Sequence, residues 1–73
     1  MTDLEIDEKI KQINDLLEAN QITIIDDYFQ DIYQDKYNNE IFRVKSQRCF
    51  ESQEEAENVL EETLAKLLAF EAS

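Results

Sequence analysis

The 73-residue chain contains no glycine, proline, histidine or tryptophan, and it has one cysteine, Cys49. Rossmann and P-loop phosphate sites and EF-hand calcium loops all require glycine, so these classes of binding site are excluded. Without histidine or a second cysteine, the chain can form neither an intramolecular disulfide nor a Cys/His zinc site. We expect one small domain, residues 1–73, that has no cofactor or metal and a thin core that includes a half-buried Cys49.

Catalytic residues are also scarce. General acid–base and nucleophilic catalysis need groups of matched pKa, and the three serines have no histidine to form a triad with. Carboxylates are abundant, and a magnesium site at Asp26, Asp27 and Asp31 is conceivable. Since 18 of the 73 residues are acidic, however, chance groupings are common, and we expect these three side chains to be solvated. The protein is therefore expected not to be an enzyme.

Long hydrophobic runs are absent as well. No apolar stretch approaches the roughly 18–20 residues of a membrane span. The first five residues, Met-Thr-Asp-Leu-Glu, are acidic where a signal peptide has a basic region. A chain of net charge −11 is also repelled by anionic lipid, so we expect a cytoplasmic protein without membrane contact.

Residues 2–19 and 53–70 have the periodicity of amphipathic helices. Both begin with capping-box spacing, in which a hydroxyl residue precedes glutamate by three positions: Thr2 and Glu5, and Ser52 and Glu55. The apolar faces consist of Ile6, Ile10, Ile13, Leu16 and Leu17 in the first segment, and of Ala56, Val59, Leu60, Leu64, Leu67 and Leu68 in the second. Asn20 is expected to end the first helix in the left-handed conformation.

Residues 21–50 are rich in β-branched and aromatic residues and predict strands. A hairpin with a two-residue turn at Asn38-Asn39 would place Tyr33 opposite Val44 and Phe29 opposite Arg48. Residues 21–25 either begin the first strand of this hairpin or form a short strand of their own. A competing interpretation makes residues 26–37 a third helix. The hairpin is favoured, because a helix would place Asp27, Asp31 and Asp35 at repelling intervals of four.

The order of these segments predicts an α+β fold. Two helices would pack on one face of a small antiparallel sheet in the order α-β-β-α, possibly with a third short strand. Two strands alone are barely stable, so a third strand or pairing across a homodimer would complete the sheet.

Charge is the most informative feature, because it is unevenly distributed. Residues 1–35 hold ten acids and two bases, a net charge of −8, and residues 49–73 hold seven acids and one base, a net charge of −6. Residues 36–48 hold four bases and one acid, a net charge of +3. The bases could contact nucleic acid, but on so acidic a chain we expect most of them to pair with neighbouring carboxylates.

The acids of the second helix are the main candidate binding residues. Glu54, Glu57 and Glu61 would line one solvent-exposed edge of it, with Glu55 and Glu62 alongside. Glutamates four apart on a helix are separated by about 6 Å of rise, comparable to the phosphates of a nucleic-acid strand. Three further acids, Asp27, Asp31 and Asp35, complete the predicted partner-binding set.

In size, acidity and helix-borne carboxylates, the chain resembles phage- or plasmid-encoded inhibitors that mimic DNA, including anti-restriction and anti-CRISPR proteins. That resemblance implies an inhibitor or regulator that docks acidic helices on a basic, nucleic-acid-binding protein without touching nucleic acid itself. The alternative is a structural, adaptor or antitoxin-like subunit with an apolar contact. Tyr28, Tyr33, Tyr37 and the outer face of the first helix would then form the interface.

Overall fold

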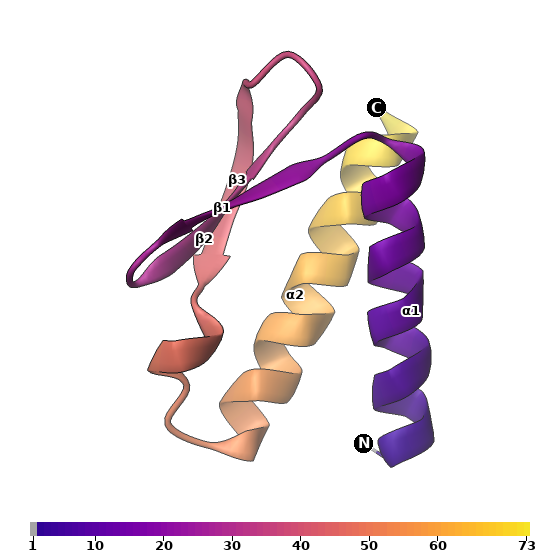
Figure 1. The fold of residues 1–73 in the computed structure, drawn as a ribbon. Helices are drawn as coiled ribbons and strands as arrows, with labels where there is room; N and C mark the ends of the chain where they lie inside the picture. Colours follow the sequence, from indigo (N-terminus) through magenta and orange to yellow (C-terminus); the bar gives the residue numbers. More distant parts are fainter. Residues whose placement is uncertain (1) are drawn as a thin grey trace.

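The computed structural model describes residues 2–73 and confirms the α+β fold (Figure 1). Helix α1 is followed by three strands, a short 3₁₀ helix and helix α2. The elements are α1 (Asp3–Ala19), β1 (Thr23–Asp27), β2 (Gln30–Gln34), β3 (Glu40–Lys45), η1 (Gln47–Cys49) and α2 (Gln53–Ala72). The third strand that the sequence left open is therefore present. No helix in this part of the chain is long and apolar enough to cross a membrane.

Both helices begin at the predicted caps. The hydroxyl oxygens of Thr2 and Ser52 accept the backbone N–H groups of Glu5 and Glu55, at 3.2 and 3.1 Å. These bonds satisfy amides that the first helical turn leaves unpaired. Asn20 ends α1 as its C-cap, as predicted, but it has φ −102° and the left-handed conformation falls on the next residue, Gln21, at φ 55°. The N–H groups of Gln21 and Ile22 donate to the carbonyl oxygens of Glu18 and Leu17, a Schellman motif in which the residue after the cap is left-handed.

The region 21–37 forms two strands, so the alternative helix over 26–37 is wrong. β1 and β2 pair antiparallel and are joined by a tight turn at Tyr28 and Phe29. Tyr28 has φ 54°, and the Phe29 N–H lies 2.5 Å from the Asp27 carbonyl oxygen. The predicted pairing of Phe29 with Arg48 is also wrong, because Phe29 lies in this turn and Arg48 lies in η1.

The register of the second hairpin also differs from the prediction. Tyr33 pairs with Phe42 and not with Val44, and the register shifts between Tyr33 and Gln34. The connection is longer than two residues because Asp35 organises it. The Asp35 carboxylate accepts the N–H groups of Tyr37 and Asn39 at 2.8 and 2.9 Å, in the manner of an Asx-turn. Only Asn38 of the expected turn has positive φ, at 65°.

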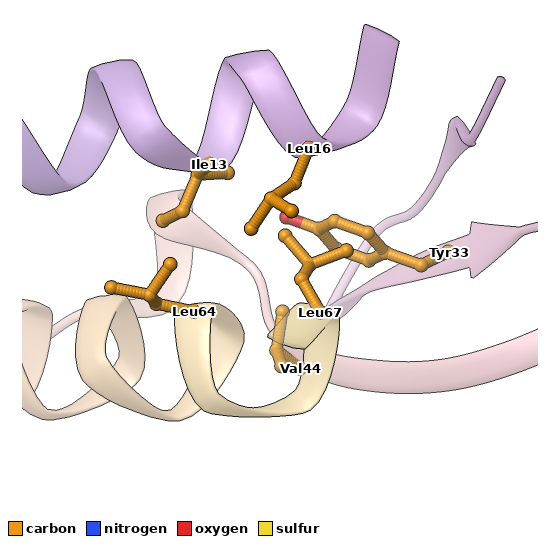
Figure 2. Close-up of a cluster of buried hydrophobic side chains, with 6 residues drawn as sticks. All are labelled: Ile13, Leu16, Tyr33, Val44, Leu64 and Leu67. Atoms are coloured by element: carbon orange, nitrogen blue, oxygen red, sulfur yellow. The ribbon is translucent and has the colours of Figure 1, made fainter. Parts of the chain in front are cut away.

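The core lies where the two helices meet the inner face of the sheet (Figure 2). It consists of Ile13, Leu16, Tyr33, Val44, Leu64 and Leu67. Leu67 has no exposed surface, and the Tyr33 ring enters between the helices and stacks on Phe42, with centroids 4.5 Å apart. α2 packs along β3, which places β1 at the far edge of the sheet.

The two helices lie side by side and run in the same direction (Figure 1). The hairpins between them return the chain to the end where α1 began, so α2 starts at the same end of the molecule as α1, and the two helices diverge toward this end. A hydrogen bond from Asn20 to Glu71 joins the two helices near their other ends. This topology decides where the acidic residues gather.

Candidate functional site

The parallel helices bring the acids in and just before their first two turns to one end of the molecule. We call this surface the acidic end and define it by Asp3, Glu5, Asp7, Glu8, Glu51, Glu54 and Glu57. All of these residues are exposed except Glu57, which is half-buried. The unpaired N–H groups of both first turns carry partial positive charge, and this charge favours carboxylates at these positions.

The predicted edge of α2 continues from the acidic end along the helix. Glu54 and Glu61 are exposed two turns apart, and Glu57 lies between them. Within residues 2–73, neither Glu54 nor Glu61 forms an ion pair. Glutamates four apart, such as Glu57 and Glu61, are separated by about 6 Å of rise. The structure therefore places these three predicted residues together on one strip.

Glu55 and Glu62 lie on a different side of α2, and both pair with cations. Glu55 forms an ion pair with Lys45 of β3, and Glu62 Oε1 lies 3.0 Å from Lys66 Nζ. The hydrogen bond from Lys45 lowers the pKa of Glu55 below its usual value, and the same bond raises the pKa of Lys45. These two glutamates are partly neutralised within the molecule, so they contribute less to the surface potential than Glu54 and Glu61 do.

The three predicted aspartates are not brought together. Asp27 ends β1 and lies 4.0 Å from Arg43, whereas Asp35 follows the opposite end of β2 and holds its loop. Asp31 lies on the inner face of β2, where burial and the nearby Asp26 raise its pKa and Arg48 partly offsets this effect. Asp26 and Asp31 pair across the strands on one face, while Asp27 points to the other face. Residues 2–73 contain no group of three acids or cysteines placed to hold a metal ion.

Three of the four basic residues within 36–48 pair with acids, as the sequence suggested, and the fourth, Lys36, lies with Nζ 5.3 Å from the centre of the Tyr37 ring. Arg48 pairs with Asp26, and Arg43 binds Glu40 with nitrogen–oxygen distances of 2.7 and 2.9 Å. The hydrogen bond from Arg43 lowers the pKa of Glu40. With Lys45 bound to Glu55, the three cations of β3 and η1 are all engaged within the molecule. They are poorly placed to attract a separate anion such as nucleic acid.

An apolar groove that the sequence did not predict lies between the helices and the inner face of the sheet. Its volume is about 460 Å³, and its walls include Ile6, Ile10, Leu17, Ile24, Phe50 and Leu60. Asp31, Lys45 and Glu57 supply polar groups to the lining. Ile10 and Ile24 remain 44% and 42% exposed, so the sheet does not fully cover the apolar faces of the helices.

Exposed aromatic side chains gather at the turn between β1 and β2. Tyr28 and Phe29 are 67% and 66% exposed, and their rings meet edge to face with centroids 4.7 Å apart. Tyr37 is exposed in the following loop, whereas Tyr33 is buried in the core and cannot form part of an interface. The half-buried Cys49 lies beneath this turn, with Sγ 3.8 Å from the Tyr28 carbonyl oxygen.

Comparisons with known proteins add no assignment. No protein-family model, curated protein or solved structure is similar enough to this chain to count as a match.

Proposed function

We propose that the protein is a non-enzymatic inhibitor or regulator that acts in the cytoplasm by docking its acidic helices on a basic, nucleic-acid-binding protein. In this proposal the acidic end and the α2 strip occupy the surface that the partner offers to phosphates. The protein would thus act as a DNA mimic, in the manner of mobile-element inhibitors such as anti-restriction and anti-CRISPR proteins.

The observation that carries the proposal is the parallel arrangement of α1 and α2. It gathers seven carboxylates at one end of the molecule, and Glu61 extends that surface along α2. Arg43 and Lys45 of β3 and Arg48 of η1 are occupied by Glu40, Glu55 and Asp26. A dense patch of one sign accelerates encounter with an oppositely charged partner and repels nucleic acid.

Maintaining this patch costs the fold some stability. Like charges four apart on a helix destabilise it by a few tenths of a kcal/mol per pair, and the −11 net charge repels itself throughout. Solubility requires less charge than this, since a net charge of about 2–8 units is enough for a small domain. The excess of negative charge on ordered helical turns supports a binding role.

A second candidate function is an adaptor or antitoxin-like subunit with an apolar contact. The exposed Tyr28–Phe29 pair favours it, because aromatic side chains that fill a partner's pocket are typical interface anchors. The buried Tyr33 does not belong to this version, which would rest on Tyr28, Phe29 and Tyr37.

The two candidates differ in how binding depends on salt. We would capture partners from the native host on the immobilised protein, identify them by mass spectrometry and measure their affinity from low to high ionic strength. Affinity that falls steeply with salt supports docking by the acidic helices, because exposed charges are screened within about 10 Å at 0.1 M salt. If salt leaves the affinity unchanged and the double variant Tyr28→Ala, Phe29→Ala abolishes binding, the result contradicts docking by the acidic helices and supports the adaptor.

A further inference from the structure

The two edges of the sheet differ in how they are protected against further strand pairing. β3 is covered by α2, carries Arg43 and Lys45, and has an extra residue, Ile41, where the register shifts. β1 has none of these features: it lacks lysine and proline, and its pairing with β2 is regular. Among residues 2–73 no strand pairs with the edge of β1 that faces away from β2, which we call the open edge.

β1 is also exposed on both faces and presents an isoleucine on each. All five of its residues are exposed, and Ile24 and Ile25, which point to opposite faces, are 42% and 43% exposed. An open, exposed edge strand is a ready template for pairing with another chain, and the two aspartates of β1 limit which chain can pair. Ile24 pairs with the buried Tyr33, and both line the groove between sheet and helices. Side chains of an added strand on that face would continue the wall of the groove beyond Ile24.

Charge decides which kind of strand would fit. Residues 12–35, which contain β1, β2 and the second half of α1, hold six acids and no bases. A second copy pairing through β1 would bring two such regions together and set two chains of charge −11 side by side. A strand that carries lysine or arginine on its outer face instead gains attraction from Asp27, which is 59% exposed and lies 4.0 Å from its own cation, Arg43.

We propose that the open edge of β1 binds an extended, basic segment of the partner protein as a fourth strand. Backbone hydrogen bonds along β1 would provide affinity, and alternate side chains would provide specificity. The segment would alternate apolar residues on the inner face, which contact Ile24 and the groove, with lysine or arginine on the outer face, near Asp27. This inference rests on the proposed function, because it takes the partner to be basic, and it adds a second contact to the acidic end.

The test uses a blocked peptide of alternating lysine and valine, and the same peptide with every internal amide nitrogen methylated. Methylation keeps the charge but removes the backbone donors that strand pairing needs. Binding is followed by amide chemical shifts and hydrogen exchange. Two protein variants, Ile24→Glu on the edge and Gln12→Glu on the exposed side of α1, both change the net charge from −11 to −12. Gln12→Glu is therefore the charge-matched control.

We expect the unmethylated peptide to shift and protect the amides of residues 23–27. Affinity should fall about tenfold or more on methylation of the peptide and in Ile24→Glu, and should be unchanged in Gln12→Glu. Equal binding of both peptides would mean attraction by charge alone, which overturns the edge inference and leaves the acidic-helix proposal standing. The edge inference is also overturned if neither peptide binds. It is overturned as well if sedimentation shows a dimer that Ile24→Glu abolishes, because the strand that pairs with β1 would then come from a second copy of the protein.

Discussion

The side-chain amide of Asn20 donates a hydrogen bond to Oε2 of Glu71, with a nitrogen–oxygen distance of 3.1 Å. The bond joins the last residues of α1 to those of α2 and shows that the helices run parallel. Neither helix has a basic residue in its last turn, whereas both carry acids in the first. The negative side chains are therefore concentrated at the end where the helix dipoles are positive, and this end is the proposed docking surface.

The core should be sensitive to loss of a single side chain, because only six hydrophobic residues between positions 2 and 73 are buried. Leu67 has no exposed surface, so Leu67→Ala should reduce the free energy of unfolding by about 2–5 kcal/mol. Leu68→Ala is the matched control, because Leu68 is 41% exposed and its replacement should reduce the free energy of unfolding far less. Urea denaturation followed by circular dichroism measures both, and equal losses would mean that Leu67 is not the centre of the core.

Local signals predicted the helices well, and the strands less well. The caps at Thr2 and Ser52 and the apolar periodicity of both segments depend on neighbours within a few positions, and the structure retains them. The turn at Tyr28 gave no such signal, because tyrosine rarely has positive φ and the chain has no glycine to mark a turn. The shifted register of Tyr33 likewise follows from the bonds that Asp35 makes across its loop.

Asp31 should destabilise the fold at neutral pH. Burial and Asp26 raise its pKa in the folded state above the usual value of 3.8, so its ionisation opposes folding. The stability contributed by the protonated Asp31 side chain is fully present below pH 3.8, and it is lost as the pH rises through the pKa of the folded state. Asp31→Asn should therefore raise the melting temperature at pH 7 and give no gain below pH 3.8. A lower melting temperature of Asp31→Asn at pH 7 would show that attraction to Arg48 outweighs burial.

The ion pair between Lys45 and Glu55 should have the opposite pH dependence. The hydrogen bond from Lys45 lowers the pKa of Glu55 below the usual 4.5, so its contribution is present above pH 4.5 and is lost as pH falls through the folded pKa. Glu55→Gln should lower the melting temperature at pH 7, and the difference from wild type should shrink below pH 4.5. Glu54→Gln, on the exposed edge of the same turn, is the control and should not lower it.

The candidate site was only partly predictable from spacing. Helical periodicity placed Glu54, Glu57 and Glu61 on one strip, because residues three and four apart lie on one face. It could not show that Glu55 would meet Lys45, since that contact depends on how the sheet packs on α2. Nor could it show that Asp27 and Asp35 lie at opposite ends of a hairpin. The acidic end itself follows from the parallel arrangement of the helices, which the order of segments alone does not determine.

The central claim is that binding depends on the position of the acids and not on total charge. The double variant Glu54→Lys, Glu61→Lys changes exposed residues in the first half of α2, and the control Asp15→Lys, Glu18→Lys changes exposed residues in the second half of α1. Each changes the net charge from −11 to −7. Circular dichroism would establish that both double variants fold. The decisive measurement is the affinity of each for the captured partner at low salt. We predict a loss of about tenfold or more for the α2 variant and a much smaller loss for the control. Equal losses in the two variants would contradict the account.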